Sequence, residues 1–445
     1  MAHADPAPTP DVAGAPLPGN ESGQTWNDEG EPPEGSLPRN LGRAVLFIPK
    51  SLAWLLLQPV RGAVYVYDRY DLENRYYETF YNESRTFGIV PVIEYATGFS
   101  IMVGGRLIAK DVFGAQENYT MMGAWGGEYQ SRAEAWLDSG TRFDPVTVTV
   151  GGNFDRFARL AFYGIGNNSN RLDMPPPTLI NPLVNDTAVQ TFYRYQEMRA
   201  ALTADWRLID DFHLLAHGAV TGIVTDESTK DPSIETVYNP MDLVGFDEMT
   251  THVYGQLEAR WDTRRNAVPT WETTQYSTGY LVSGYVGGVQ GLGDAHNFAH
   301  YGVDLQAFVH LALGPRMLWF RFLGEGVTGD LNEIPFAELP YLGGDFLRGY
   351  DFARFRDRVS ALAVAQYTWD LSRFTNAYLF VDAGRVYHSI EDATLDDMNV
   401  GFGGGIELQS SKSFLLAATL ASSIDGGVFV SAVLAPYHSQ VPRWR

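Results

Sequence analysis

The stretch Tyr301-Gly-Val-Asp-Leu-Gln-Ala-Phe-Val-His-Leu311 carries the pattern that decides the fold. Apolar side chains at positions 303, 305, 307, 309 and 311 alternate with polar ones at 304, 306 and 310. Successive side chains of an extended chain point to opposite faces, so this stretch has one apolar and one polar face. The same period of two recurs over 146–150, 199–207, 256–264 and 400–409. The sequence therefore predicts a protein built from amphipathic β-strands.

The composition excludes several classes of protein. The chain has 445 residues, no cysteine, and 53 acidic against 32 basic side chains, which gives a formal net charge of -21. Without cysteine it can have neither a disulfide scaffold nor a cysteine-based zinc site. Its acidity argues against nucleic acid as a partner, because phosphate affinity comes mainly from Lys and Arg. No apolar run is long enough for a transmembrane helix.

The apolar strand faces either bury one another in a soluble sandwich or meet lipid around a transmembrane barrel. Three features favour the barrel. The alternation persists over more residues than the five or six that are usual in soluble strands. The polar faces hold opposite charges, such as Glu258 beside Arg260, which suit a wet lumen. The strands also follow one another as hairpins without helical crossovers.

Sixteen segments fit this pattern, an even number, as expected for a bacterial barrel. They are 88–98, 99–113, 117–129, 131–140, 145–157, 190–209, 212–226, 251–264, 276–291, 296–313, 316–329, 359–371, 375–388, 398–410, 413–424 and 427–436. Long connections at 158–189, 227–250 and 330–358 predict the extracellular end, and the short turns predict the periplasmic end. The predicted fold class is all-β membrane: a 16-stranded antiparallel transmembrane β-barrel with an N-terminal amphipathic helix and a disordered tail.

The segments outside the barrel differ from it in composition. Residues 1–37 are rich in Pro, Gly and acid and predict a disordered tail. Residues 38–87 predict an amphipathic helical segment, which can lie in the membrane interface or pack against the barrel. The barrel is expected over 88–436, with a C-terminal tail over 437–445. The start Ala2-His3-Ala4 resembles the remnant of an export cleavage site, so the expected location is the bacterial outer membrane.

The 330–358 connection contains the motif Leu342-Gly-Gly-Asp-Phe-Leu-Arg-Gly-Tyr350. Gly343, Gly344 and Gly349 permit a sharply bent backbone. Arg348 cannot lose its charge, so a loop folded into the lumen needs an acidic partner for it. Asp382 in Phe380-Val-Asp-Ala-Gly384 is the candidate, because its neighbours in the strand face lipid and it therefore faces inward. The pair can either stiffen the barrel or take a direct part in function.

These motifs resemble the BamA/TamA superfamily of outer-membrane assembly factors, the bacterial surface antigen family. The loop motif resembles that family's signature in its sixth extracellular loop, and Phe380-Val-Asp-Ala-Gly384 resembles the signature strand that follows. Trp261-Asp-Thr-Arg-Arg-Asn-Ala-Val-Pro269 and Phe162-Tyr-Gly-Ile-Gly-Asn-Asn-Ser169 are similar to two further pieces of the family's barrel. The resemblance implies a sixteen-stranded barrel in which the loop arginine is held against the strand aspartate. The site residues expected from the motifs are Gly343, Gly344, Leu347, Arg348, Gly349 and Tyr350 in the loop, Phe380, Asp382, Gly384 and Gln366 around its anchor, and Asp262, Arg264 and Pro269 in the hairpin.

The sequence departs from the family at several places. Gln366 and Thr368 stand where the family usually has Glu-x-Arg, so a second acidic partner for Arg348 is missing. Trp271 stands where the hairpin would often have Gly. The residues before the barrel show no POTRA repeats, the periplasmic domains that receive substrate polypeptides. Insertion that depends on delivery by such domains is therefore in doubt.

Three functions remain open. The resemblance implies help with insertion or translocation of proteins or lipids. The partners expected from it are the bilayer, client outer-membrane proteins or lipids, and a periplasmic protein. The alternatives are a channel or porin, and a plugged barrel with a structural or interaction role. The sequence holds no Gly-x-Ser-x-Gly or His-Glu-x-x-His motif, and we expect no enzyme activity, no catalytic residues, no cofactor and no metal site.

Overall fold

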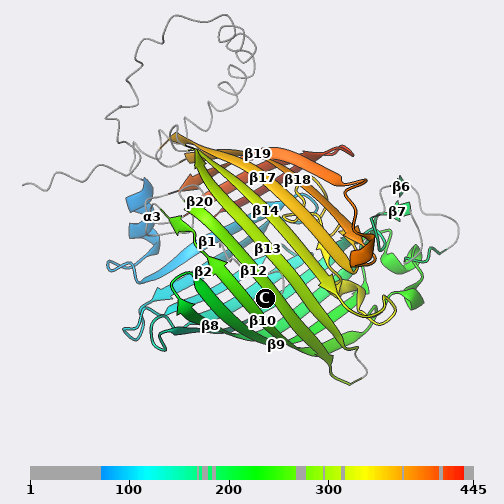
Figure 1. The fold of residues 1–445 in the computed structure, drawn as a ribbon, viewed down its shortest axis with the longest axis horizontal. Helices are drawn as coiled ribbons and strands as arrows, with labels where there is room; N and C mark the ends of the chain where they lie inside the picture. The colour runs from blue at the N-terminus through cyan, green and yellow to red at the C-terminus, as the bar shows by residue number, and fades with distance from the viewer. Residues whose placement is uncertain are drawn as a thin grey trace, which may run out of the picture.

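The barrel predicted from the alternation is present in a computed structural model (Figure 1). The structure describes residues 72–167, 170–172, 179–182, 187–266, 277–293, 296–311, 316–372, 375–409 and 414–434. The predicted tails at 1–37 and 437–445, most of the 38–87 segment, Pro269 and Trp271 lie outside these residues. Sixteen long antiparallel strands, each paired with two neighbours, close into one barrel, which confirms the predicted fold class.

The long strands lie where the alternation places them. Their bounds are β1 (Phe87–Ala96), β2 (Met102–Lys110), β3 (Asn118–Trp125), β4 (Gln130–Asp138), β5 (Val146–Phe162), β8 (Thr191–Ile209), β9 (Phe212–Glu227), β10 (Met249–Asp262), β12 (Ser277–Gly291), β13 (Phe298–Leu311), β14 (Arg316–Val327), β17 (Val359–Ser372), β18 (Thr375–Tyr387), β19 (Asn399–Gln409), β20 (Phe414–Ser423) and β21 (Phe429–Leu434). Each pairs with its neighbour along the chain, and β1 pairs with β21 to close the ring.

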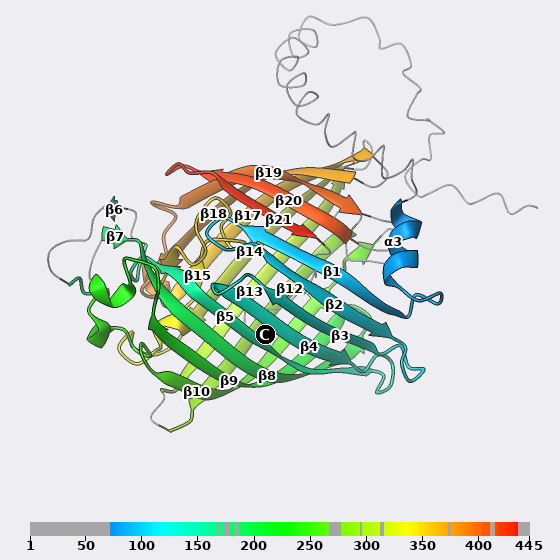
Figure 2. The ribbon, with the colours of Figure 1, turned by 180° about the vertical axis from the view of Figure 1, so that it is seen from behind.

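Short elements occupy the connections. The described 3-10 helices are η1 (Ile234–Thr236), η2 (Pro240–Asp242), η4 (Phe336–Glu338) and η5 (Ile390–Asp392). The short strands are β6 (Asn170–Leu172), β7 (Thr187–Val189), β11 (Arg265–Asn266), β15 (Tyr341–Leu342) and β16 (Phe355–Arg356). The helix α3 (Leu72–Phe80) lies beside the barrel end at which β1 begins (Figures 1 and 2). No helix among the described residues is long and apolar enough to cross a membrane.

The apolar faces of the strands point outward. Leu257 is 66% exposed, whereas its neighbour Glu258 is 5% exposed and faces the lumen. The same alternation gives β10 a regular pattern of exposed and buried residues. In a bilayer the outward apolar side chains meet lipid, and the inward polar ones find partners inside the barrel. Glu258, for example, accepts hydrogen bonds from Arg260 and from Ser283 on the next strand.

The strands differ greatly in length around the ring. β8 has 19 residues and β9 has 16, whereas β1 has 10 and β21 has 6. In the described residues, β1 and β21 pair at only four positions, from Ile93↔Leu434 to Ala96↔Ser431. We call this junction the seam. Near the other end of β1, Tyr81 pairs with Gly88, so the segment after α3 lies against the first strand.

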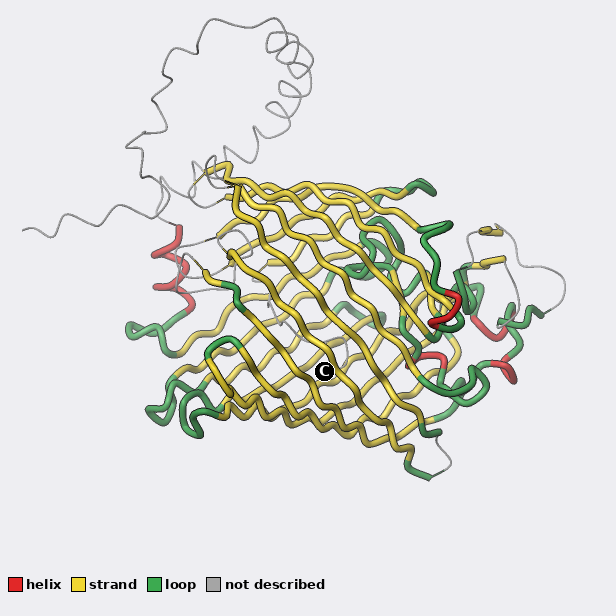
Figure 3. Tube along the Cα trace, in the orientation of Figure 1, coloured by secondary structure: helices red, strands yellow, loops and turns green. Residues whose placement is uncertain are grey.

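The long connections gather at one end of the barrel (Figure 3). Buried apolar side chains of 160–189, 234–243 and 327–339 pack into one cluster there. Phe162, Tyr238 and Phe336 are at its centre, with ring centroids 5.1 and 5.4 Å apart for the two pairs that include Phe162. We call this cluster the loop cap. It gives the long-loop end a packed core of its own, and it adjoins the loop that carries the glycine–arginine motif.

Candidate functional site: the folded-in loop and its anchor

The loop between β14 and β17 folds back on itself as a small hairpin. β15 pairs with β16 through Tyr341↔Arg356 and Leu342↔Phe355. Gly343 has a φ of 120°, and a Cβ there would lie 2.0 Å from the Asp351 carbonyl oxygen. A side chain at this position would therefore clash with the backbone, besides being strained at that φ. The turn is so tight that only glycine fits at position 343, the first glycine of the motif.

Arg348 at the tip of this loop is bound to the barrel wall by its side chain and its backbone. Its Nε and Nη2 donate to the two carboxylate oxygens of Asp382 at 2.8 and 2.7 Å, and its backbone N–H donates to the same carboxylate at 3.0 Å. Asp382 is 1% exposed. A bidentate guanidinium–carboxylate pair is among the strongest polar contacts in proteins. The structure thus brings together the arginine and the aspartate that the sequence singled out.

Two further residues from the predicted set complete the surroundings of the guanidinium. Gln366 accepts a hydrogen bond from Arg348 Nη1 at 2.9 Å, and the Phe380 ring lies 3.5 Å from the guanidinium carbon. Gln366 therefore supplies a neutral acceptor at the position where the sequence lacks an acid. The guanidinium is held by one charge, one amide and one ring face.

Small residues on the neighbouring strands let the loop approach the wall closely. A Cβ at Gly401 on β19 would lie 1.7 Å from the Arg348 carbonyl oxygen, and one at Gly384 would lie 2.9 Å from Leu342 Cδ1. Leu347, by contrast, is fully buried in a cluster with Leu342, Phe355 and residues of the wall. The glycines on the strands make room for the loop, and the leucine fills that room.

Hydrogen bonds to residues outside the predicted set also hold this region in place. The Tyr350 hydroxyl donates to Asp425, in the turn between β20 and β21, at 2.9 Å. Asn167 accepts from the Asn399 side chain at 2.7 Å, and the Gly166 N–H donates to the Arg356 carbonyl at 2.6 Å. Asn167 belongs to the Phe162–Ser169 motif noted in the sequence, but the spacing gave no indication of its partner on β19.

The loop also contacts the far wall through η4. Glu338 is 3% exposed and lies 3.6 Å from His252 Nε2 on β10. Arg356 donates to the Phe336 carbonyl across the loop at 2.5 Å. The loop therefore spans the lumen from β10 to β18–β20. In the described residues, no group of three His, Asp or Glu side chains is arranged to hold a metal ion.

The hairpin motif lies at the opposite end of the barrel from the loop cap. Arg264 donates to both carboxylate oxygens of Asp262, at 2.8 and 2.6 Å, and lies over the Phe308 ring of β13. The third predicted member, Pro269, is outside the described residues. The structure therefore separates this motif from Arg348 and assigns it to the end of the β10–β12 hairpin.

Comparison with known proteins supports the architecture. The structure is similar to the crystal structure of BamA from Haemophilus ducreyi lacking POTRA domains 1-3, with a TM-score of 0.53, 11% identity, and coverage of 78% of this chain and 69% of that one. It is also similar to CdiB from Escherichia coli, with a TM-score of 0.50, 10% identity, and coverage of 78% of this chain and 62% of that one. No family model matches the sequence, and no curated protein matches it. The chain has the sixteen-stranded barrel fold of these membrane proteins.

Proposed function

We propose that this protein resides in a bacterial outer membrane and assists the insertion or translocation of proteins or lipids there. The observation that carries the proposal is the seam, where four pairs of described residues join β1 to β21, whereas β8 and β9 pair over most of their length. A weakly paired edge can exchange its partner for another extended strand, because the same backbone groups serve both. The likeness to BamA and CdiB in fold supports the same reading, as do the loop motif and its anchor.

Client outer-membrane proteins or lipids would be the partners of the seam, and a periplasmic protein could deliver them. The loop contacts β18–β20, which lead directly into the seam through β21. In this proposal the loop keeps the last strands in place while β1 and β21 separate. The role of Arg348 and Asp382 is therefore to stabilise, not to contact the client.

Cross-linking the seam tests the proposal. Ala96 and Ser431 face each other across the seam, are both small, and can be replaced by a cysteine pair in a chain that has no other cysteine. We expect the oxidised A96C/S431C protein to lose insertion activity in proteoliposomes and to regain it on reduction. The matched control is A201C/A219C, a facing pair of small residues on β8 and β9. Full activity of the oxidised seam variant would refute the seam mechanism.

A plugged barrel with an interaction role is the second candidate, and the loop cap favours it over a channel. The cap places a buried apolar cluster across the long-loop end. We expect planar bilayers with the protein to show no large, steady conductance, and deletion of 330–358 to create it. Steady conductance of the intact protein would favour the channel. Absence of both insertion activity and conductance in the intact protein would favour the interaction role.

A further inference from the structure

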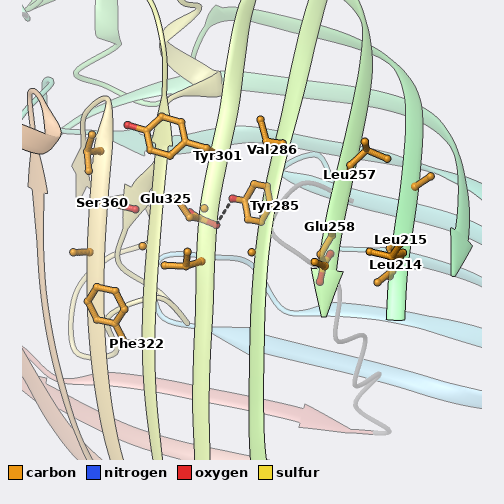
Figure 4. A pocket seen from close by; sticks show the side chains of 18 of the residues that line it. Leu214, Leu215, Leu257, Glu258, Tyr285, Val286, Tyr301, Phe322, Glu325 and Ser360 are labelled. Carbon is orange, nitrogen blue, oxygen red and sulfur yellow. Dashed lines mark hydrogen bonds between the residues drawn. The ribbon is translucent and has the colours of Figure 1, made fainter. Parts of the chain in front are cut away.

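The outer wall of the barrel carries an apolar groove of about 1060 Å³ that crosses β8 to β17 (Figure 4). Strand register places its floor on a single row of facing residues. That row runs through Leu214, Ala259, Gly284, Val303, Gly324 and Ala361. Four of these six are Gly or Ala, whereas Leu257 and Val286 at the rim are 66% and 61% exposed. A line of small residues bordered by large ones forms the depression.

One end of the groove is closed by the connection between β18 and β19. Ile390 and Ala393 of this connection line the groove together with Tyr387. Tyr387 is only 6% exposed, and its hydroxyl donates to the Thr394 carbonyl. The connection therefore folds over the outer face of the wall at the long-loop end. The groove has a defined end and is not simply uneven packing along the strands.

The next position on the same row is a guanidinium. Ala361 faces Arg385 across β17 and β18, so Arg385 continues the line of the groove on the outward face. Its Nη1 donates to the Asp396 carbonyl and lies 3.7 Å from the Asp397 carboxylate, which is 89% exposed. The Arg385 side chain is 24% exposed, so a phosphate group can reach the guanidinium at the edge of the lipid-facing belt.

The lining of the groove is mostly apolar. Glu258 and Glu325 are among its lining residues, but both point into the lumen, where Glu258 is hydrogen-bonded to Arg260 and Glu325 lies 3.5 Å from the Tyr285 hydroxyl. Apart from the Trp206 indole and the Tyr301 and Tyr387 hydroxyls, the outward side chains along the groove are apolar. The surroundings are the apolar belt of a transmembrane barrel, so the available occupant is a lipid chain. The volume is at the upper end of the roughly 300–1,000 Å³ of small-molecule sites.

We propose that this groove binds one zwitterionic phospholipid, with an acyl chain on the Gly/Ala row and the phosphate at Arg385. The headgroup choice follows from the charges of the β18–β19 connection. The Asp397 carboxylate lies 3.7 Å from the guanidinium, and the same connection also contains Glu391, Asp392 and Asp396. An ammonium group beside the phosphate would meet these carboxylates, whereas an anionic lipid would be repelled by them. The proposal does not depend on the seam.

The test is native mass spectrometry of the full chain in detergent, with added phosphatidylethanolamine or phosphatidylglycerol of the same acyl chains. We expect one retained phosphatidylethanolamine and about tenfold weaker binding of phosphatidylglycerol. Filling the floor with G284L/G324L should weaken phosphatidylethanolamine binding at least about tenfold. A Cβ at either glycine would meet nothing closer than 3.5 Å, so the backbone can accept the change. R385Q should weaken binding of both lipids, and D397N should reduce the preference between them.

The control is G123L on the outward face of β3, where a Cβ would meet nothing within 4 Å. It should bind phosphatidylethanolamine as the parent does, and circular dichroism should show that all variants are folded. Unchanged binding by G284L/G324L would overturn the proposal. Equal binding of the two lipids by the parent would overturn the headgroup assignment. A dimer that only G284L/G324L abolishes would show that a second copy of the chain occupies the groove instead.

Discussion

The seam and the β8–β9 wall close the same barrel with very different amounts of pairing. Within the described residues, β1 and β21 face each other at four positions, whereas β8 and β9 pair from Tyr193↔Glu227 to Ile209↔Phe212. The wall has long strands, and the loop cap packs against their inner face at one end. The short strands next to the seam are contacted by the loop instead. Arg348, Gly349 and Tyr350 of the loop contact β18, β19 and the β20–β21 turn. The difference teaches that tertiary contacts within the lumen compensate where backbone pairing is short.

The largest expected effect comes from removing the anchor of the loop. Asp382→Ala would leave Arg348, whose side chain is 18% exposed, without its charge partner. Breaking a buried pair on one side costs about 3–5 kcal/mol. We expect a matching loss of stability in urea unfolding, with hydrogen exchange accelerated in β18–β21 before β8 and β9.

Asp304→Ala is the matched control, since the Asp304–Arg321 pair also lies in the lumen but is about one-fifth exposed on both sides. Its loss should cost about 1 kcal/mol or less. Equal destabilisation by the two substitutions would show that the Arg348–Asp382 pair contributes no more to stability than another ion pair in the lumen.

A substitution on β19 tests whether close approach of the loop matters as much as its ion pair. Gly401→Val would place a side chain where the Arg348 carbonyl lies, and overpacking of this kind costs about 1–3 kcal/mol. We expect faster proteolysis within 330–358. Gly288→Val on β12, where a Cβ meets nothing within 4 Å, should leave the cleavage rate unchanged. Resistance of the Gly401 variant would contradict the tight packing.

Two tyrosines allow the same small change on each side of the barrel. Tyr350→Phe removes the hydrogen bond to Asp425 beside the seam. We expect this loss to lower the free energy of unfolding by about 1 kcal/mol. Tyr238→Phe removes the bond to the Val189 carbonyl in the loop cap. Hydrogen exchange should rise at 424–428 in the first variant and at 187–189 in the second. Identical exchange patterns would mean that the two regions are coupled as one unit.

The smallest expected effect concerns pH at the short-turn end. A hydrogen bond from Arg142 lowers the pKa of Glu117 to about 2 from its usual 4.5. A carboxylate with a lowered pKa stabilises the folded state above its usual pKa and loses that contribution as pH falls through about 2. We expect the 111–117 and 139–145 turns to stay protected from exchange at pH 5 and to loosen between pH 4 and 2. Arg142→Ala should move this loosening to higher pH.

The sequence predicted the parts that depend on a local period. The sixteen strands follow from alternation, and the inward direction of Asp382 follows from its neighbours. The same reasoning could not predict the contact of Asn167 with Asn399 or that of Tyr350 with Asp425, because each joins a connection to a part of the barrel that is 232 or 75 residues away in the chain. It also missed the groove, whose floor appears only when the register between six strands is known.

The separation in sequence of the contacts around the loop has a consequence for how the barrel assembles. Arg348 and Asp382 are 34 residues apart, Tyr350 and Asp425 are 75, Asn167 and Asn399 are 232, and Thr97 and Val430 beside the seam are 333. The entropy lost on closing a chain segment grows with its length. We therefore expect the loop to settle on β18 as soon as that strand forms, the loop cap to follow, and the ring to close last. The motif then acts early in folding, as a local nucleus around which the final strands are added.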